Sequence, residues 1–346
     1  MANVRDIRRR IRSVKNTRQI TRAMKMVAAA KLRRAQERAL ASRTYAQMLV
    51  NVLQSTVSRA DLLHPKTGRP LNPLLAVRPE QNVLLVLVTG DRGLAGAFNS
   101  NVLKAATKFI DRFKDKNIDI LAVGRKGRDF MRRRYPVGKF GEGQARAGQI
   151  QIVGEHLNLL AKLEYEPVWE IAEHIAKAYK EERIDSVYLI FNEFKSVISQ
   201  RLIAQRILPV QELGRREVAL AEEFTLEERE RMGEAARAAG ISLKEPGPTA
   251  SEIEAAKFGT APVDYIYEQP REEIFAGLLP RYMAFQLFQG MLESVAAENA
   301  ARMTAMDSAS NNADDVIDSL TLTMNRARQA SITKEIIEIV SGAAAL

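Results

Sequence analysis

Cysteine is absent from the 346-residue sequence. This absence excludes disulfide bonds, a thiolate nucleophile and cysteine ligands for a metal, and it favours an intracellular protein. The three histidines, His64, His156 and His174, do not have the spacing of a helical metal-binding pair. We therefore expect neither a metal centre nor another cofactor.

Long apolar runs are also absent. The longest lies within residues 82–90, far short of the roughly 20 residues that a membrane-spanning helix needs. An apolar content of 46% is nevertheless enough to bury a core in a chain of this length. The sequence predicts a folded protein of one to three domains that does not cross a membrane by itself.

Proline and glycine are missing from residues 3–58. In this segment Val4, Ile7, Ile11 and Val14 are spaced by three, four and three residues, which is typical of a coiled-coil seam. The pattern predicts a helical rod of roughly 80 Å. Such a rod is too long to be hidden inside one globular domain.

A second helical pattern follows Pro270 and continues to about Ser341. Its apolar residues recur with a period of about 3.5 to 3.6 residues, and Pro280 and Gly290 interrupt it, as does Gly277. Pro280 lies near the start, where we expect it to bend the helix rather than end it. Because the two predicted rods have matching seams, we expect them to pack as an antiparallel coiled coil.

Acidic residues are scarce at the N-terminus. Residues 1–60 hold 15 Lys or Arg but only two acids, Asp6 and Glu37, which gives a net charge of +13. The other 286 residues hold 37 cations and 40 anions, which gives a net charge of −3. The whole positive excess of the chain therefore belongs to the predicted N-terminal rod.

An arginine-rich N-terminus is also typical of a mitochondrial transit peptide. The helical pattern, however, continues to about Ser58 without a break that resembles a cleavage site. We therefore interpret the segment as part of the mature fold, and we expect a bacterial source.

The sequence predicts four regions in the fold class α/β. They are an N-terminal coiled-coil helix at 1–60, a linker rich in proline and glycine at 61–80, an α/β domain at 81–270 and a C-terminal coiled-coil helix at 271–346. Residues 213–262, within the α/β domain, are charged and rich in alanine, and a short helix is predicted at about 225–239. We interpret them as an exposed insertion.

The α/β domain shows alternating strand and helix patterns. Strands are predicted at 82–90 and 118–124, helices at 99–115 and 167–182, and a two-stranded hairpin at 186–210 that turns near Lys195. This alternation favours a parallel sheet with covering helices.

One glycine-rich motif, TGDRGLAGAFN at residues 89–99, follows a predicted strand and begins a helix. A phosphate-binding loop occupies this place in nucleotide-binding folds. Here Gly90, Gly93 and Gly96 have G-x-x-G-x-x-G spacing, which matches neither a dinucleotide fingerprint nor a P-loop. We interpret the motif as a tight turn rather than a nucleotide site.

No arrangement of residues predicts catalysis. Asp314 and Asp315 are adjacent on a predicted helix and therefore point apart, and no Ser/His/Asp arrangement is visible. The basic RRRY segment at 132–135 is interpreted as a solvated face rather than a nucleic-acid patch.

The basic N-terminal helix has three interpretations. A DNA-binding basic region would separate its cations from its dimerising seam, whereas here the two overlap. A membrane-surface helix would carry bulky Trp, Phe or Leu, whereas residues 21–34, TRAMKMVAAAKLRR, offer Ala and Met. Small and adaptable side chains flanked by cations favour a shaft that contacts protein partners. A basic coiled coil that binds nucleic acid is the alternative.

Four stretches of the sequence resemble the γ subunits of F-type ATP synthases. They are residues 1–36, the TGDRGLAGAFN motif, DYIYEQP at 264–270 and the C-terminal segment from MTAMDSAS to VSGAAA. The resemblance covers both terminal helices and implies a two-helix antiparallel coiled coil with a Rossmann-like domain. It also implies a rotating central stalk that couples proton flow through a membrane c-ring to ATP synthesis or hydrolysis, without being a catalyst itself.

The resemblance further implies partners and site residues. Three α and three β subunits would surround the shaft, an ε subunit would bind beside it, and no nucleic acid would be involved. Arg328 and Gln329 match positions that hydrogen-bond an acidic loop of β, and Met24 matches a position facing the β lever. Tyr265 and Glu268 match the foot on the c-ring.

The same resemblance implies a peripheral location on the cytoplasmic face of the bacterial inner membrane. The small apolar C-terminus, VSGAAAL, would lie in a hydrophobic bearing of the α and β subunits. The cysteine pair through which chloroplast relatives are regulated is absent. The insertion at 213–262 is longer than in the compact form of the family, which leaves local contacts with ε and the c-ring open.

Overall fold

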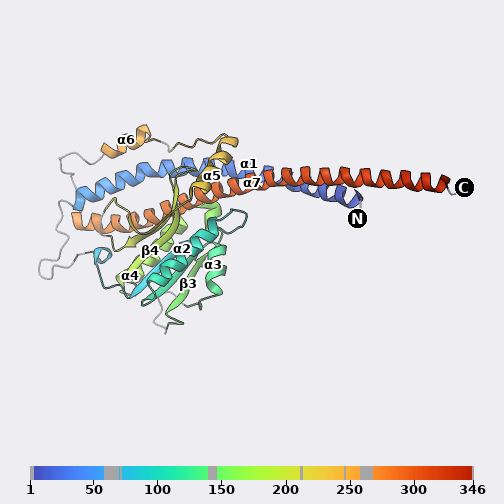
Figure 1. The fold of residues 1–346 in the computed structure, drawn as a ribbon. Helices are drawn as coiled ribbons and strands as arrows, with labels where there is room; N and C mark the ends of the chain where they lie inside the picture. The colour runs from blue at the N-terminus through green and yellow to red at the C-terminus, as the bar shows by residue number, and fades with distance from the viewer. Residues whose placement is uncertain are drawn as a thin grey trace.

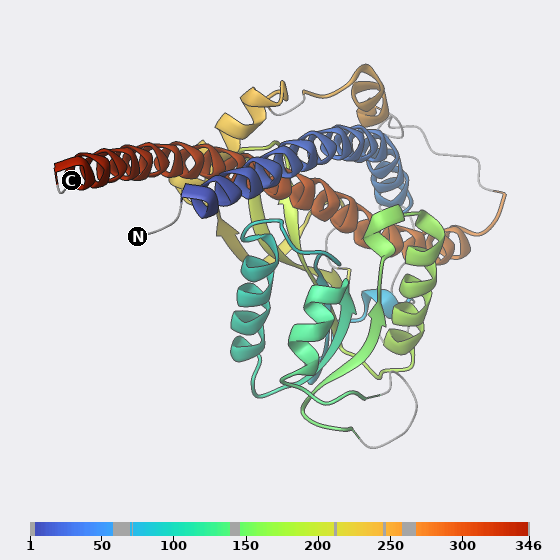
Figure 2. The ribbon, with the colours of Figure 1, turned by 90° about the vertical axis from the view of Figure 1, so that its right-hand side faces the viewer.

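Two long terminal helices dominate the computed structural model, which describes residues 4–57, 70, 72–138, 146–210, 213–244, 247–257 and 268–344. Helix α1 (Val4–Val57) has 54 residues and helix α7 (Arg271–Ala344) has 74. They run antiparallel, and α7 continues past the start of α1 (Figures 1 and 2). Helix α7 passes through Pro280 and Gly290 without ending, so both predicted rods are confirmed.

A six-stranded sheet lies beneath the left-hand part of the helix pair in Figure 1. Its order is β3-β2-β1-β4-β5-β6. The strands are β1 (Asn82–Val88), β2 (Asn117–Val123), β3 (Ile150–His156), β4 (Ser186–Phe194), β5 (Gln200–Leu208) and β6 (Glu217–Glu223). The first four are mutually parallel, while β5 and β6 are antiparallel to their neighbours. The predicted parallel sheet and its hairpin are confirmed.

Helices cover both faces of the sheet. Leu84, Val86 and Val88 of β1 pack with α4 (Tyr165–Lys180) and the first part of α7, whereas Val83 and Leu85 pack with α2 (Phe98–Arg112). Because successive strand residues point to opposite faces, a central parallel strand must be apolar throughout. Helix α3 (Arg125–Arg132) follows β2, and short 3₁₀ helices lie at Pro73–Leu75 and Leu159–Lys162.

Residues 213–262 differ from the predicted exposed insertion. Strand β6 extends the sheet by pairing with β5. Helix α5 (Leu226–Ala238) buries Met232, Ala235 and Ala236, and helix α6 (Ala250–Lys257) buries Ala255. Half of the apolar residues of this segment are alanines. Alanines give the sequence a weak apolar pattern, but they allow one helix to pack closely on another. The limits of the four predicted regions stay a prediction.

Candidate functional site

The shaft, defined here as α1 together with α7, begins with an isoleucine seam at the N-terminus of α1. Ile7 and Ile11 of α1 and Ile317 of α7 are buried together, and Leu320 and Met324 pack against them. These positions follow the coiled-coil spacing of the sequence. The seam therefore holds the two helices together where no part of the sheet supports them (Figure 1).

Further along the shaft, polar contacts take the place of the isoleucine seam. The hydroxyl groups of Thr21 and Ser310 lie 2.7 Å apart in a buried position. Asp314 forms ion pairs with Arg18 and, at 3.0 Å, with Arg22. The hydrogen bond from Arg18 and the charges of both arginines lower the pKa of Asp314 below its ordinary value. Part of the basic charge of α1 is thus neutralised by its partner helix.

Alanine packing follows these polar contacts. Ala28, Ala29 and Leu32 of α1 are buried against α7 and α5, in a cluster that includes Ala296, Ala297, Ala300 and Ala301 of α7 and Ala235 and Ala236 of α5. Small side chains let three helices approach closely and still exclude water. Two of the four alanines of TRAMKMVAAAKLRR, Ala28 and Ala29, therefore pack inside the shaft, whereas Ala23 and Ala30 are exposed.

Several apolar side chains of α1 face solvent instead. Ile20, Met26 and Val27 are 60%, 67% and 56% exposed. Met24, the predicted partner contact, is only half-buried. The sequence pattern predicts that the seam resumes at Ile20, Met24 and Val27. The exposure of Ile20 and Val27 shows that this part of the prediction is wrong, and Met26 was not predicted as a contact. This face of α1 can meet a partner through apolar contact.

The end of α7 has no companion helix among the described residues. Every described side chain from Arg328 to Ser341 is exposed, and the helix extends past the start of α1 in both views (Figures 1 and 2). Five large apolar side chains are exposed there: Ile332, Ile336, Ile337, Ile339 and Val340. Arg328 and Gln329 lie where this free end of α7, residues 328–344, begins, so both are accessible to a partner.

The predicted foot residues are only partly described. Glu268 is exposed and lies just before α7 begins. Tyr265 lies outside the described residues. Their predicted contact with a membrane ring therefore stays a prediction.

The TGDRGLAGAFN loop uses its polar groups within the fold. Asp91 accepts hydrogen bonds from the backbone of Arg125 (3.0 Å) and Asn158 (3.1 Å), and the Oγ1 atom of Thr89 accepts one from Gly127 (2.8 Å). A Cβ atom on Gly90 would lie 2.8 Å from the carboxylate of Glu298 in α7. An acidic side chain thus lies against the loop where a phosphate would have to enter, which accords with the interpretation as a tight turn.

A network of ion pairs joins the sheet to α7. Arg216 contacts Glu193 of β4 at 3.0 Å and Glu293 of α7 at 2.5 Å, and Arg201 also pairs with Glu193. Burial alone would raise the pKa of Glu193, but the hydrogen bond from Arg201 and the charge of Arg216 lower it below its ordinary value. The network holds the edge of the sheet on the shaft. No sequence motif predicted it.

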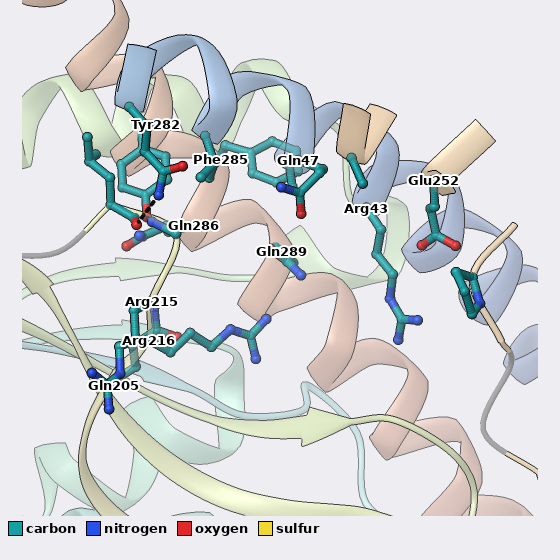
Figure 3. A pocket seen from close by; sticks show the side chains of 17 residues that line it. Arg43, Gln47, Gln205, Arg215, Arg216, Glu252, Tyr282, Phe285, Gln286 and Gln289 are labelled. Atoms are coloured by element: carbon teal, nitrogen blue, oxygen red, sulfur yellow. Dashed lines mark hydrogen bonds between the residues drawn. The ribbon is translucent and has the colours of Figure 1, made fainter. Parts of the chain in front are cut away.

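A polar cleft of about 920 Å³ opens beside this network, between α1, α7 and α6 (Figure 3). Arg43, Gln47, Gln286 and Gln289 line it on the shaft side. The Oε1 atom of Gln286 is buried and has no hydrogen-bond partner within the described part of the chain. The cleft is large enough for a ligand, but its walls contain no pair of groups arranged for acid–base chemistry.

Metal ligand groups and membrane-spanning helices are both absent from the described residues. Within the described ranges, no group of three or more His, Asp or Glu side chains is placed to hold a metal ion. None of the described helices combines the length and the apolar character that crossing a bilayer requires.

Solved structures with a similar fold come from mitochondrial ATP synthases. A chain of the Euglena gracilis mitochondrial ATP synthase aligns with a TM-score of 0.56 and 17% identity, covering 99% of this chain and 94% of that one. A chain from the Tetrahymena thermophila mitochondrial ATP synthase, in a structure of the central stalk and c-ring, aligns with a TM-score of 0.52 and 22% identity. It covers 84% of this chain and 99% of its own. These likenesses establish the fold.

Sequence comparison goes further. The profile of a family described as ATP synthase matches residues 3–346. The ATP synthase gamma chain of Solibacter usitatus is 44% identical over 345 residues, which is 100% of this chain and 99% of that protein. The gamma chain of Geobacter metallireducens is 41% identical, over 99% of this chain and 98% of its own. The chain therefore belongs to the ATP synthase gamma chain family, the central-stalk subunits of F-type rotary complexes.

Proposed function

We propose that this gamma chain turns as a non-catalytic shaft inside a ring of three α and three β subunits. Its other end would rest on a membrane c-ring beside an ε subunit, on the cytoplasmic face of a bacterial inner membrane. Proton flow through the ring would then be coupled to ATP synthesis or hydrolysis at β. The observation that carries the proposal is the free end of α7, whose described side chains are all exposed from Arg328 to Ser341.

The free end has the form that insertion into a protein sleeve requires. Ile332, Ile336 and Ile339 recur at helical spacing on α7 and are 49%, 55% and 71% exposed. An exposed apolar stripe of this kind is costly in water and marks a surface that another protein covers. It supports a bearing made of α and β subunits, in which apolar contact allows rotation without fixed polar bonds.

A rotating shaft acts through differential contact. A partner that binds every conformation of β equally well shifts none of them, whatever its affinity. The shaft offers different surfaces around its axis, because α1 exposes Ile20, Met26 and Val27 on its outer face, whereas Asp314 is turned toward the arginines of α1. Its rotation would present each β subunit in turn with a different surface, and so with a different preferred nucleotide state.

Specific contacts are proposed at both ends of the chain. Arg328 and Gln329, at the start of the free end, would hydrogen-bond an acidic loop of β, for which the planar guanidinium of arginine is well suited. Met24 would face the β lever. Glu268 and Tyr265 would form the foot on the c-ring.

The nucleic-acid alternative is not supported. Family membership covers the whole chain. In addition, Arg18, Arg22 and Lys25 of the basic helix form ion pairs with Asp314 and Asp307 of α7. Cations that are already paired within the shaft contribute less to phosphate binding.

The proposed function can be tested by co-expressing the chain with the α and β subunits of the same organism, followed by size analysis and an ATPase assay. We expect one copy to co-elute with three α and three β subunits and ATP hydrolysis to depend on its presence. A variant ending at Ala327 keeps the isoleucine seam and lacks the free end, and it should hydrolyse ATP more slowly. Separate elution, with hydrolysis unaffected by the chain, would reject the proposal.

A further inference from the structure

Helices α5 and α6 follow each other in sequence but are held on the shaft in different ways. Helix α5 buries Met232, Ala235 and Ala236 in the alanine cluster of the shaft. Helix α6 buries only Ala255, and its one large aliphatic residue, Ile253, is 49% exposed. A helix with so few buried apolar contacts opens at a much lower free-energy cost than its neighbours.

The C-terminal end of α6 is bound by Asn51 of α1. The Nδ2 atom of Asn51 donates to the carbonyl oxygens of Ala255 (3.0 Å) and Ala256 (3.4 Å). Gln47, one turn earlier in α1, donates to the Oδ1 atom of Asn51 at 2.8 Å. This second bond fixes which end of the Asn51 amide faces α6. Carbonyl groups at the C-terminal end of a helix lack hydrogen-bond donors within the helix, and the Asn51 amide supplies a donor to them.

The N-terminal end of α6 needs no help from the shaft. The backbone N–H of Glu252 donates to the Oγ1 atom of Thr249 (3.2 Å), and the backbone N–H of Thr249 donates to the Glu252 carboxylate (2.6 Å). This reciprocal capping box is local to α6 and its lead-in. The bonds from Asn51 to the last turn therefore contribute to holding α6 on α1, together with a weaker hydroxyl contact of 3.4 Å between Thr44 and Ser251.

Helix α6 also forms one wall of the polar cleft. Pro248, Glu252 and Ala256 line the cleft opposite residues of the shaft, among them Arg43 (Figure 3). If α6 leaves α1, this wall is removed. The Arg43 guanidinium and the glutamine amides of the shaft then become accessible from the α6 side.

We propose that α6 is a latch, held at Asn51, that opens reversibly from α1 and uncovers the polar cleft while α5 stays in place. An eight-residue helix is marginal in water by itself, so release from Asn51 and loss of helical structure occur together. The proposal does not depend on the rotor function, because it concerns contacts within this chain alone.

Hydrogen exchange of the full-length chain tests the latch. In the unmodified protein we expect the amides of α6 to exchange at least about ten-fold faster than those of α5. Asn51→Ala should raise exchange in α6 by roughly 5- to 30-fold, because it removes the hydrogen bonds to the helix end, and should leave α5 unchanged. Gln54→Ala is the matched control, since Gln54 on the same helix donates instead to the carbonyl of Leu213 at 3.0 Å.

A crosslink tests the same proposal from the opposite direction. The chain has no cysteine, so Thr44→Cys combined with Ser251→Cys introduces a single pair at the site of the hydroxyl contact. The oxidised protein should protect α6 from exchange, and the reduced protein and each single variant should not. Slow exchange of α6 in the unmodified protein, equal to that of α5, would overturn the latch, as would unchanged exchange in Asn51→Ala.

Discussion

The Oγ1 atom of Thr21 in α1 lies 2.7 Å from the Oγ atom of Ser310 in α7, at the point where isoleucine packing of the shaft gives way to alanine packing. Each hydroxyl also contacts its own helix, Thr21 at the carbonyl of Arg18 and Ser310 at that of Met306. Apolar seams tolerate slippage more readily than a directional bond does. A single buried polar pair therefore fixes the register of the two helices.

This relationship predicts a coupled effect on stability. Thr21→Val and Ser310→Ala should each lower the free energy of unfolding of the shaft by about 1 kcal/mol, which is typical of one lost hydrogen bond. The double variant should cost less than the sum of both, by at least about 0.5 kcal/mol. Urea unfolding followed by helical circular dichroism measures the cycle, and strict additivity would show that the two hydroxyls do not interact.

Asp314 predicts a dependence of shaft stability on pH. The hydrogen bond from Arg18 lowers the folded-state pKa of Asp314 below its ordinary value of 3.8. A lowered folded pKa contributes stability that is present above the ordinary value and is lost as pH falls through the lowered one. The unmodified shaft should therefore be more stable than Asp314→Asn at pH 6, and the difference should disappear as pH falls well below 3.8.

Thermal unfolding of both proteins from pH 6 to pH 2 measures this difference. Its control is Asp315→Asn, at the exposed neighbouring position, which should follow the unmodified protein throughout. A difference between the unmodified protein and Asp314→Asn that stays constant with pH would contradict the assignment.

The sequence predicted the shaft and most of the sheet because both depend on local periodicity. Ile7 and Ile11 recur at coiled-coil spacing and are buried, and the apolar run of β1 becomes a central parallel strand. Such patterns are visible within one turn or a few alternations of the chain. Their burial needs no knowledge of distant residues.

Features that depend on distant partners could not be predicted. Strand β6 has the sequence EVALAEE, which is too polar to predict a strand by itself. It forms because it pairs with the otherwise free edge of β5, which the sequence does not reveal. The family resemblance predicts a partner contact at Met24. Met26 is the more exposed of the two, because of how α1 turns against α7. Glu193 and Arg216 are separated by a hairpin and meet only in the folded sheet.

Arg216 predicts a large loss of stability on substitution. Arg216→Met leaves the nearly buried carboxylates of Glu193 and Glu293 without their shared cation. We expect a loss of about 3–5 kcal/mol at neutral pH, as for other broken buried pairs. Protonation removes the unpaired charge. The difference in free energy of unfolding between Arg216→Met and the unmodified protein should therefore narrow as pH falls below the ordinary glutamate pKa of 4.5.

Denaturant unfolding at pH 7 and pH 4 measures this effect. The control is Lys108→Met, which breaks the exposed ion pair with Glu222 and should cost less than about 1 kcal/mol. A loss for Arg216→Met no larger than that of the control would show that the network does not hold the sheet edge on α7.

The same added charge should have different effects on stability at Met24 and at Met26. Met26 is 67% exposed, so Met26→Lys should change the stability of the isolated chain by no more than about 0.5 kcal/mol. Met24 is half-buried, so Met24→Lys should destabilise the shaft by about 1 kcal/mol or more. In the assembled complex, Met26→Lys should still slow ATP turnover. Equal stability losses for both variants would contradict the exposure difference.

Arg328 predicts a functional effect without a structural one. It is exposed at the start of the free end of α7 and has no ion pair among the residues that the structure describes. Arg328→Ala should therefore leave assembly intact and slow ATP turnover by roughly ten-fold, the effect of losing one charge-assisted hydrogen bond. The ATP turnover of Arg328→Lys should fall between that of the unmodified protein and that of Arg328→Ala, because an ammonium group keeps the charge but lacks the planar fork.

Arg326→Ala is the matched control for Arg328, since two residues along a helix point about 200° apart. Arg326 is also exposed, so the control removes an equal charge from the other side of α7. A turnover defect confined to Arg328 would assign the effect to a directional contact on one face of the helix. Equal defects in both variants would instead assign it to the overall charge of the free end, and unchanged turnover in Arg328→Ala would remove Arg328 from the coupling mechanism.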